Sequence, residues 1–443
     1  MMRKISIKIT VLFVYFFLTI PFFGQSTIRL VHEVQKGETL YSLSKKYNVT
    51  IDEILGVNPE LSHRKNAKVK HGYLLNIPHT SKATQPSNSI NAKDTFNLAV
   101  ILPFTSNNTI SERVVEYYRG ILLATHAAKS AGYSVEVSAF DEPSQKESII
   151  PLLNEVSQSK FDFIVGPLYP THFNDVCAFA HDNKQRTIIP FSSKVSNASS
   201  NPFVYLLNTP GTMANRKVAQ LFDATFKPAR IIIVRTKKSD KQELIEHLTH
   251  HFISNKYEVQ TLPSTIFTED IKRVVTTERQ NVFIFDGSDW NSSFKLLQTI
   301  ANFKSSQPLY RISVVGHNEW QNYAMDNSDI LHDANTYILA SDFYNAYEKA
   351  VIDFEETYKK WFKTYPIIYL PRMGELGYDS GLFMFNALAL YGKDFENQEV
   401  NANYLQTKFN FERISNNGGY ANTNMMFIHY SQNQKVECIE LKK

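Results

Sequence analysis

The feature that most constrains the fold of this chain is an alternation of short apolar runs with amphipathic segments, beginning near Thr95. The apolar runs have the length of buried strands, and the segments between them have helical periodicity. Strands are expected at residues 96–102, 135–140, 161–165, 187–190, 230–234, 282–285, 312–315 and 336–340. Helices are expected at residues 115–129, 147–158 and 241–254, among others. Such alternation predicts an α/β fold with parallel sheets covered on both faces, and the number of strands favours two stacked lobes.

The composition predicts a packed fold, and the charge argues against binding of nucleic acid. The chain has 443 residues, of which 43% are hydrophobic, with 31 Phe and 23 Tyr, so a packed fold is expected. The formal net charge is only +4 and no basic cluster dominates, which gives no electrostatic case for binding nucleic acid.

The N-terminus resembles an export signal. Arg3, Lys4 and Lys8 precede an apolar run over residues 9–23, and small residues follow up to Ser26. This order predicts a signal peptide over residues 1–26 and a protein of the periplasm or cell envelope, and an uncleaved anchor is the alternative. The run is shorter than the roughly 18 residues that a spanning helix needs. No later stretch is long and apolar enough to span a bilayer, and the remaining chain is nearly neutral.

Residues 31–78 have the pattern of a small βααβ domain. An alternating stretch at residues 31–34 predicts a strand, and Leu40 and Leu43 mark one face of a helix. Thr50 and Glu53 form a capping-box pattern for a second helix, which Pro59 ends. A closing strand is expected at residues 73–78.

This segment resembles the LysM module in residues 34–43, in the Asn58-Pro59 step and in the exit at residues 75–78. The resemblance implies binding of glycans that contain N-acetylglucosamine, such as peptidoglycan or chitin. It also implies a groove between two loops, formed by Gly37, Glu38, Thr39, Leu40, Asn58, Pro59, Glu60 and Leu61. The alternative is that Gly37 and Pro59 serve only the turns.

Residues 79–94 are rich in Ser, Thr and Asn and predict a flexible linker. The remainder, residues 95–443, resembles type 1 periplasmic binding proteins such as the leucine/isoleucine/valine-binding proteins. The matching stretches are residues 98–103, 118–124, 162–168, 189–193 and 377–379. By this resemblance, lobe one comprises residues 95–209 and 341–392, and lobe two comprises residues 210–340 and 393–443.

In that family a ligand lies between the lobes, at the carboxyl ends of the strands. The positions that match here are Tyr169, Thr171, Ser192 and Ser193 in lobe one and Asp286, Ser288 and Asp289 in lobe two. The resemblance implies a small polar ligand such as an amino acid. The alternative is that these residues cap loops in a cleft that binds nothing.

Other candidate sites are weaker. Glu243, His247 and His251 share one face of an expected helix with His250 beside them, and a solvated face is the preferred interpretation over a metal site. The loop 316–320 either lines the cleft or is capped by a packed Trp320. Cys177 is expected to be a buried thiol, and pairing with Cys438 stays open.

Nucleotide-binding and serine-hydrolase motifs are absent, so we expect no enzymatic activity, no cofactor and no metal. Two hypotheses for function follow. The first is an exported envelope protein that binds peptidoglycan and captures a small polar ligand. The second is a ligand-free scaffold or regulator of cell-wall enzymes with the same fold.

Overall fold

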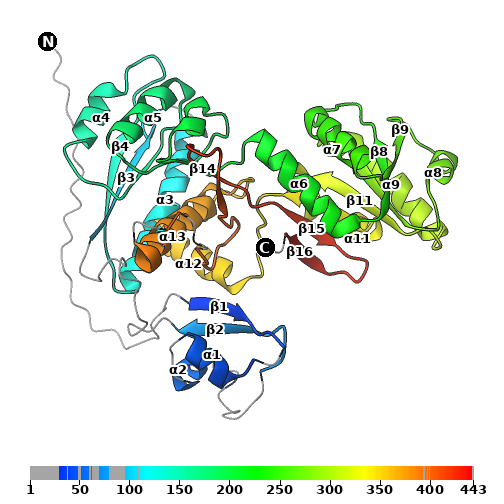
Figure 1. The fold of residues 1–443 in the computed structure, drawn as a ribbon, viewed down its shortest axis with the longest axis horizontal. Helices are drawn as coiled ribbons and strands as arrows, with labels where there is room; N and C mark the ends of the chain where they lie inside the picture. Colours follow the sequence, from blue (N-terminus) through cyan, green and yellow to red (C-terminus); the bar gives the residue numbers. More distant parts are fainter. Residues whose placement is uncertain are drawn as a thin grey trace.

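The computed structural model contains two clearly different parts, a small N-terminal module and a larger α/β region (Figure 1). It describes residues 29–36, 38–47, 51–58, 61, 69–78, 95–106, 109–392, 395–396, 398 and 400–441. The expected signal peptide and the expected linker lie outside these residues. None of the helices in the described ranges combines the length and the apolar character that a membrane crossing requires.

The N-terminal module has the βααβ order that the sequence predicts. It consists of β1 (Arg29–Glu33), α1 (Leu40–Lys46), α2 (Ile51–Gly56) and β2 (Leu74–Pro78). The two strands pair antiparallel, with Val31 opposite Asn76. Leu43, Ile54 and Leu75 are fully buried between the sheet and the helices, so the apolar positions that set the helical periodicity form the core.

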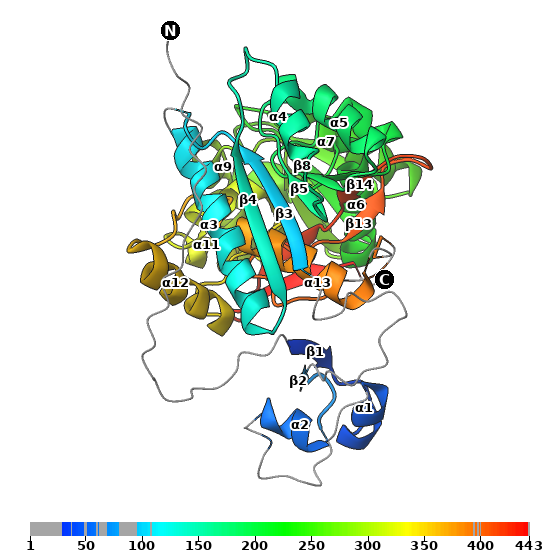
Figure 2. The same cartoon turned by 90° about the vertical axis from the view of Figure 1, so that its left-hand side faces the viewer.

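Lobe one is built on a seven-stranded sheet in the order β13-β14-β7-β6-β5-β3-β4. Its strands are β3 (Thr95–Leu102), β4 (Ser134–Asp141), β5 (Phe163–Val165), β6 (Thr187–Ile189), β7 (Val204–Leu206), β13 (Phe411–Arg413) and β14 (Tyr420–Asn422). Its helices are α3 (Thr109–Ser130), α4 (Ile150–Val156), α5 (Phe173–Asp182), α12 (Lys349–Phe362) and α13 (Met373–Tyr391), with short 3-10 turns η2 (Pro170–His172) and η3 (Ser196–Ser200). Figure 2 shows α3, β3 and β4 of this lobe facing the viewer.

Lobe two has a second seven-stranded sheet in the order β16-β15-β12-β11-β10-β8-β9. Its strands are β8 (Ala229–Val234), β9 (Glu258–Leu262), β10 (Gln280–Phe285), β11 (Ile312–His317), β12 (Thr336–Ala340), β15 (Met426–Tyr430) and β16 (Val436–Glu440). Its helices are α6 (Gly211–Phe226), α7 (Gln242–Ser254), α8 (Thr268–Val274), α9 (Trp290–Ser306), α10 (Gln321–Ala324) and α11 (Ser328–Asp333), with the 3-10 turn η4 (Asn318–Trp320). The strands from β8 to β12 pair in parallel, as the alternation predicts.

The C-terminal region differs from the division expected from the sequence. Residues 393–443 were assigned to lobe two, but β13 and β14 lie in the sheet of lobe one, where β14 pairs with β7. The rings of Tyr205 and Tyr420 stack there with their centroids 5.0 Å apart. Only β15 and β16 join lobe two. The chain therefore crosses between the lobes three times.

Small residues let α3 and α13 pack closely in lobe one. A Cβ atom placed on Gly120 would lie 1.9 Å from the carbonyl oxygen of Gly374, and one on Gly377 would lie 1.9 Å from that of Tyr117. These positions admit no side chain because the obstructing atoms are backbone atoms, which cannot rotate away.

We expect Gly120→Ala to destabilise the α/β region by about 3 kcal/mol, because overpacking against backbone forces the two helices apart. Urea denaturation monitored by circular dichroism measures the change. Gly211→Ala is the matched control, since its new Cβ would lie 3.8 Å from the nearest atom, the Glu243 carboxylate. Equal unfolding midpoints for the two variants would contradict the close-packing argument.

Candidate functional site

The loop after β5, at the carboxyl edge of the lobe-one sheet, is held by a buried carboxylate. Glu142 follows β4 and accepts the backbone N–H groups of Leu168 at 2.8 Å and Tyr169 at 3.0 Å. It also contacts the Nδ1 atom of His172 at 2.8 Å. Glu142 and His172 are only 4% and 2% exposed, so this arrangement is part of the lobe's interior.

The hydrogen-bond partners of Glu142 and His172 show where the protons of this pair lie. The Nε2 atom of His172 lies 3.1 Å from the carbonyl oxygen of Glu147, and this nitrogen must donate because a carbonyl only accepts. A proton must therefore also lie between Nδ1 and the Glu142 carboxylate. Burial raises the pKa of Glu142, while the hydrogen bonds from Leu168 and His172 oppose that rise. The sequence analysis did not single out Glu142 or His172, because each lies far from the other in the chain.

The four lobe-one residues implied by the family resemblance have different environments. Tyr169 is buried, with its ring edge against His172. The Ser192 hydroxyl accepts the backbone N–H of Lys194 at 3.1 Å. Thr171 is exposed and Ser193 is half-buried, and no hydrogen-bond partner for either hydroxyl occurs within the described ranges. Thr171 and Ser193 therefore keep hydroxyl groups that a ligand can use.

In lobe two, Asp286 holds the neighbouring loop, which follows β8. Asp286 is fully buried after β10. One carboxylate oxygen accepts the backbone N–H of Thr236 at 2.7 Å and the Thr236 hydroxyl at 2.8 Å. The other accepts the Ser239 hydroxyl at 2.8 Å and an Arg235 guanidinium N–H at 3.2 Å. Four donors therefore occupy both oxygens of this carboxylate.

Ser288 and Asp289 have similar internal functions. The backbone N–H and the hydroxyl of Ser288 donate to Asp240 at 2.7 and 2.6 Å. Asp289 caps the N-terminus of α9, where it accepts the backbone N–H of Ser292 at 2.9 Å. Bonds from Ser292 hold the pKa of Asp289 below its ordinary value. For these lobe-two residues the contacts fit the alternative interpretation, in which they cap loops.

The remaining sequence candidates also have structural explanations. Trp320 is fully buried against Gly316, and His317 donates to the carbonyl oxygen of Phe285 at 2.7 Å. On α7, His247 is exposed, while His251 contacts Asp223 at 3.1 Å. In the part of the chain that is described, no group of three or more His, Cys, Asp or Glu side chains is arranged to hold a metal ion.

The two cysteines lie in different lobes, Cys177 buried in α5 and Cys438 exposed on β16. Both thiols are free in this structure. The expectation of a buried free thiol at Cys177 is confirmed.

In the N-terminal module, Glu38 lies at the centre of a polar cluster. Its carboxylate accepts the backbone N–H of Gln35 at 2.8 Å, the Nε2 proton of His32 at 2.5 Å and the Lys46 ammonium at 3.2 Å. The Tyr47 hydroxyl lies 2.8 Å from Nδ1 of His32, which fits a histidine that carries its proton on Nε2. These bonds, led by the one from Gln35, lower the pKa of Glu38 to about 2.

The other expected groove residues divide into exposed and buried ones. Thr39 is exposed and caps α1 through reciprocal bonds with Ser42. Leu40 belongs to the core, and Leu61 packs partly against it. Asn58 is buried and joins the end of α2 to β2, because its amide donates to the carbonyl oxygens of Ile54 and Asn76 and accepts the N–H of Asn76.

Gly37, Pro59 and Glu60 lie outside the described residues. Glu38 and Thr39 are therefore the expected groove residues whose polar groups are seen at the surface.

Comparison with known proteins finds a family model that matches the N-terminal module and solved structures that are similar to the α/β region. Residues 32–78 match the family model of the LysM domain. No curated protein matches the chain. Among solved structures, a protein named as a branched-chain amino acid ABC transporter from Rhodospirillum rubrum is 11% identical, with a TM-score of 0.54 over 78% of this chain and 100% of that chain.

Two further solved structures are similar at lower TM-scores. The branched-chain amino acid transporter substrate binding protein LivJ from Streptococcus pneumoniae, in complex with isoleucine, is 15% identical, with a TM-score of 0.40 over 79% of this chain and 100% of that chain. A branched-chain amino acid ABC transporter periplasmic ligand-binding protein from Burkholderia xenovorans is 10% identical, with a TM-score of 0.46 over 78% and 94%. The likeness to the Rhodospirillum protein shows that the α/β region has the type 1 periplasmic binding-protein fold.

We expect Glu38 to titrate near pH 2 in the folded chain. Because this pKa lies below the ordinary value of 4.5, Glu38 stabilises the module fully above about pH 4.5 and loses that contribution as the pH falls toward 2. Carbon-13 NMR of glutamate carboxylates measures the titration, and the spectrum of Glu38→Gln assigns the signal. A midpoint at 4 or above would show that the cluster around Glu38 does not form.

Proposed function

We propose that this is an exported, non-enzymatic protein of the cell envelope. Its LysM domain binds a glycan that contains N-acetylglucosamine, such as peptidoglycan, and its two-lobed domain is a scaffold for a cell-wall enzyme. The observation that carries the scaffold assignment is the occupied carboxylate of Asp286. In this proposal the periplasmic-binding-protein fold supplies a surface rather than an amino-acid site.

The argument against amino-acid capture is energetic. An amino-acid ligand brings an ammonium group, which needs an available carboxylate inside a closed cleft. Asp286 is 0% exposed and is already bound by Thr236, Ser239 and Arg235. Redirecting it toward a ligand would leave buried donors unpaired, at a cost of about 1–3 kcal/mol for each.

A second candidate function, capture of a small polar ligand, is favoured by the hydroxyl groups of Thr171 and Ser193. Both lie on loops at the carboxyl edge of the lobe-one sheet, where ligands of open α/β sheets bind. A ligand held this way would depend on hydroxyl contacts and not on a lobe-two carboxylate.

The anchoring function is supported by the LysM match and by the rigidity of its framework. Asn58 fixes the end of α2 to β2, and Thr39 fixes the start of α1. A rigid loop pair can present backbone donors and acceptors to sugar amides without a large ordering cost.

Deletion of residues 31–78 should abolish cosedimentation of the protein with purified peptidoglycan, because the remaining region is proposed to have no glycan site of comparable affinity. Soluble N-acetylglucosamine oligomers should release the full chain from the pellet. Circular dichroism of the deletion variant controls for folding of the two lobes. Retention of the folded deletion variant in the pellet would refute the glycan anchor.

A thermal-shift screen of the full chain against the twenty amino acids should give no stabilisation. Binding at one hundred times the Kd would contribute about 2.7 kcal/mol, which is readily seen. A shift with any amino acid that Ser193→Ala abolishes would overturn the scaffold proposal and establish capture. Thr261→Ala, on β9 away from the crevice loops, is the matched control for loss of a hydroxyl.

A further inference from the structure

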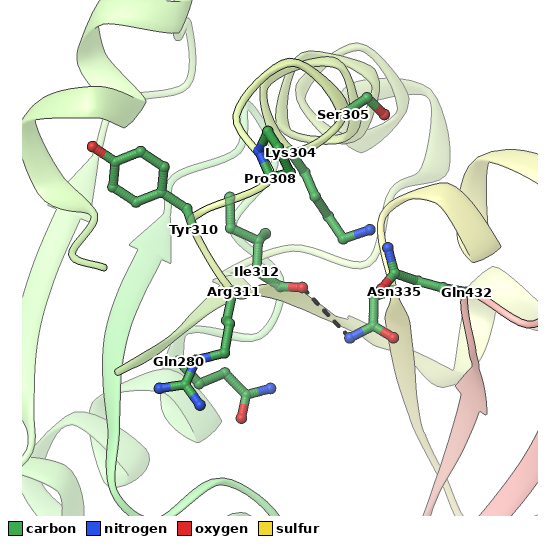
Figure 3. A pocket seen from close by; sticks show the side chains of 9 residues that line it. All are labelled: Gln280, Lys304, Ser305, Pro308, Tyr310, Arg311, Ile312, Asn335 and Gln432. Carbon is green, nitrogen blue, oxygen red and sulfur yellow. Dashed lines mark hydrogen bonds between the residues drawn. The ribbon is translucent and has the colours of Figure 1, made fainter. Parts of the chain in front are cut away.

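A cavity of about 590 Å³ lies in lobe two (Figure 3). It is bounded by the C-terminal turn of α9, by the loop that enters β11 and by the turn between β15 and β16. The nine lining residues are Gln280, Lys304, Ser305, Pro308, Tyr310, Arg311, Ile312, Asn335 and Gln432. Gln280 begins β10 and Ile312 begins β11, so the cavity is at the amino edge of the sheet.

This location separates the cavity from the expected ligand site of the fold. Ligands of open α/β sheets bind outside the carboxyl ends of the strands, where Asp286 follows β10. The cavity is at the opposite ends of β10 and β11. Its size lies within the range of about 300–1,000 Å³ that is typical of small-molecule sites.

The lining carries positive charge. Lys304 and Arg311 contribute two cations, and no carboxylate residue is among the nine lining residues. The other polar side chains are three carboxamides, one hydroxyl and one phenol. Figure 3 shows the Lys304 ammonium extending toward Asn335 and Gln432, while Arg311 and Gln280 lie on the other side of Ile312.

Both cations have backbone partners. The Lys304 ammonium donates to the carbonyl oxygen of Asp333 at 2.7 Å, and Arg311 donates to that of Glu278 at 3.2 Å. Lys304 is half-buried, and this burial lowers its pKa, although the nearby charge of Asp333 partly offsets the effect. A partly desolvated ammonium with donors to spare is stabilised when an anion approaches.

The floor of the cavity is rigid. The Ser313 hydroxyl accepts the Gln280 amide at 2.9 Å and the Asn335 amide at 2.7 Å. The oxygen of Asn335 lies 2.9 Å from Nε2 of His429, so its amide orientation is fixed. Side chains that are already held in place lose little conformational entropy when a ligand binds, whereas the side chains of a flexible surface patch would lose more.

We propose that this cavity is a binding site for a small anionic ligand, a carboxylate or phosphate group on a molecule of about monosaccharide size. Lys304 binds the anionic group, and Arg311, the carboxamides and Tyr310 contact other polar groups of the ligand. The site includes none of the residues expected in the inter-lobe cleft or in the LysM groove. A negative result for this site would therefore leave the proposed scaffold function unaffected, and the reverse also holds.

Isothermal titration of the full chain tests the proposal with inorganic phosphate, N-acetylglucosamine 1-phosphate, N-acetylmuramic acid and neutral N-acetylglucosamine. The neutral sugar reports binding by the LysM domain alone. We expect at least one anionic probe to bind at a second site, more weakly as salt rises. Stronger binding of the phosphate sugar or of the carboxylate sugar identifies the source of the anion.

Lys304→Met and Arg311→Gln should each weaken that second binding event at least tenfold, because each removes a charge-assisted hydrogen bond. Lys295→Gln, an exposed cation on the same helix α9, should leave it unchanged. Arg311 is exposed, so its variant keeps the test valid even if Lys304→Met is unstable. Absence of a second binding event, or equal affinity in the Lys304 and Arg311 variants and the wild type, would overturn the proposal.

Discussion

The two-lobed region depends on buried carboxylates that hold loops together by accepting backbone N–H groups. Asp379 on α13 is the clearest case, because it accepts the N–H groups of Leu405, Gln406 and Thr407 at 2.7–3.0 Å. Leu405, Gln406 and Thr407 precede β13 in the chain. Asp379 therefore fixes the segment through which the chain enters the sheet of lobe one. Burial raises the pKa of Asp379 to about 8, and the hydrogen bonds from the three backbone N–H groups only partly oppose that rise.

Glu142 and Asp286 apply the same device at the carboxyl edges of the two sheets. Glu142 fixes the loop after β5 through Leu168 and Tyr169, and Asp286 fixes the loop after β8 through Thr236. Asp286, the acid expected to recognise a ligand's ammonium, is thus used to hold a loop. Because this carboxylate has a structural role and is not available to bind a ligand, we propose that the two-lobed domain is a scaffold.

Much of the fold could be predicted from the sequence, because its signals are local. The eight strands expected from apolar runs are present as β3, β4, β5, β6, β8, β10, β11 and β12. The LysM module was equally readable from its turns and helix caps. By contrast, β13 and β14 have only three residues each, and their pairing rests on contacts such as Tyr205 with Tyr420, which no local pattern encodes. The division implied by the family resemblance, with residues 393–443 in lobe two, is therefore wrong for β13 and β14.

The candidate site was harder to predict because the same residue types cap loops and bind ligands. Nothing in the residues around Asp286 shows that Ser239 and Arg235, some fifty positions away, occupy its oxygens. Glu142 and His172 form a buried pair, yet thirty residues separate them. Only the tertiary structure distinguishes a carboxylate with free oxygens from one that is fully bound.

The charges of lobe two point to where an anion can bind. At the carboxyl edge of its sheet, Lys238 pairs with Asp289 at 3.4 Å and Lys241 pairs with Glu319 at 2.5 Å. At the amino edge, Lys304 and Arg311 donate to backbone carbonyl oxygens, and neither forms an ion pair within the described residues. A cation that is paired with a carboxylate must give up an ion pair to bind a ligand, whereas Lys304 and Arg311 would give up only a hydrogen bond to a carbonyl oxygen. An anion at the amino edge of the lobe-two sheet would therefore displace no carboxylate from Lys304 or Arg311, at the end of the sheet that the fold does not ordinarily use.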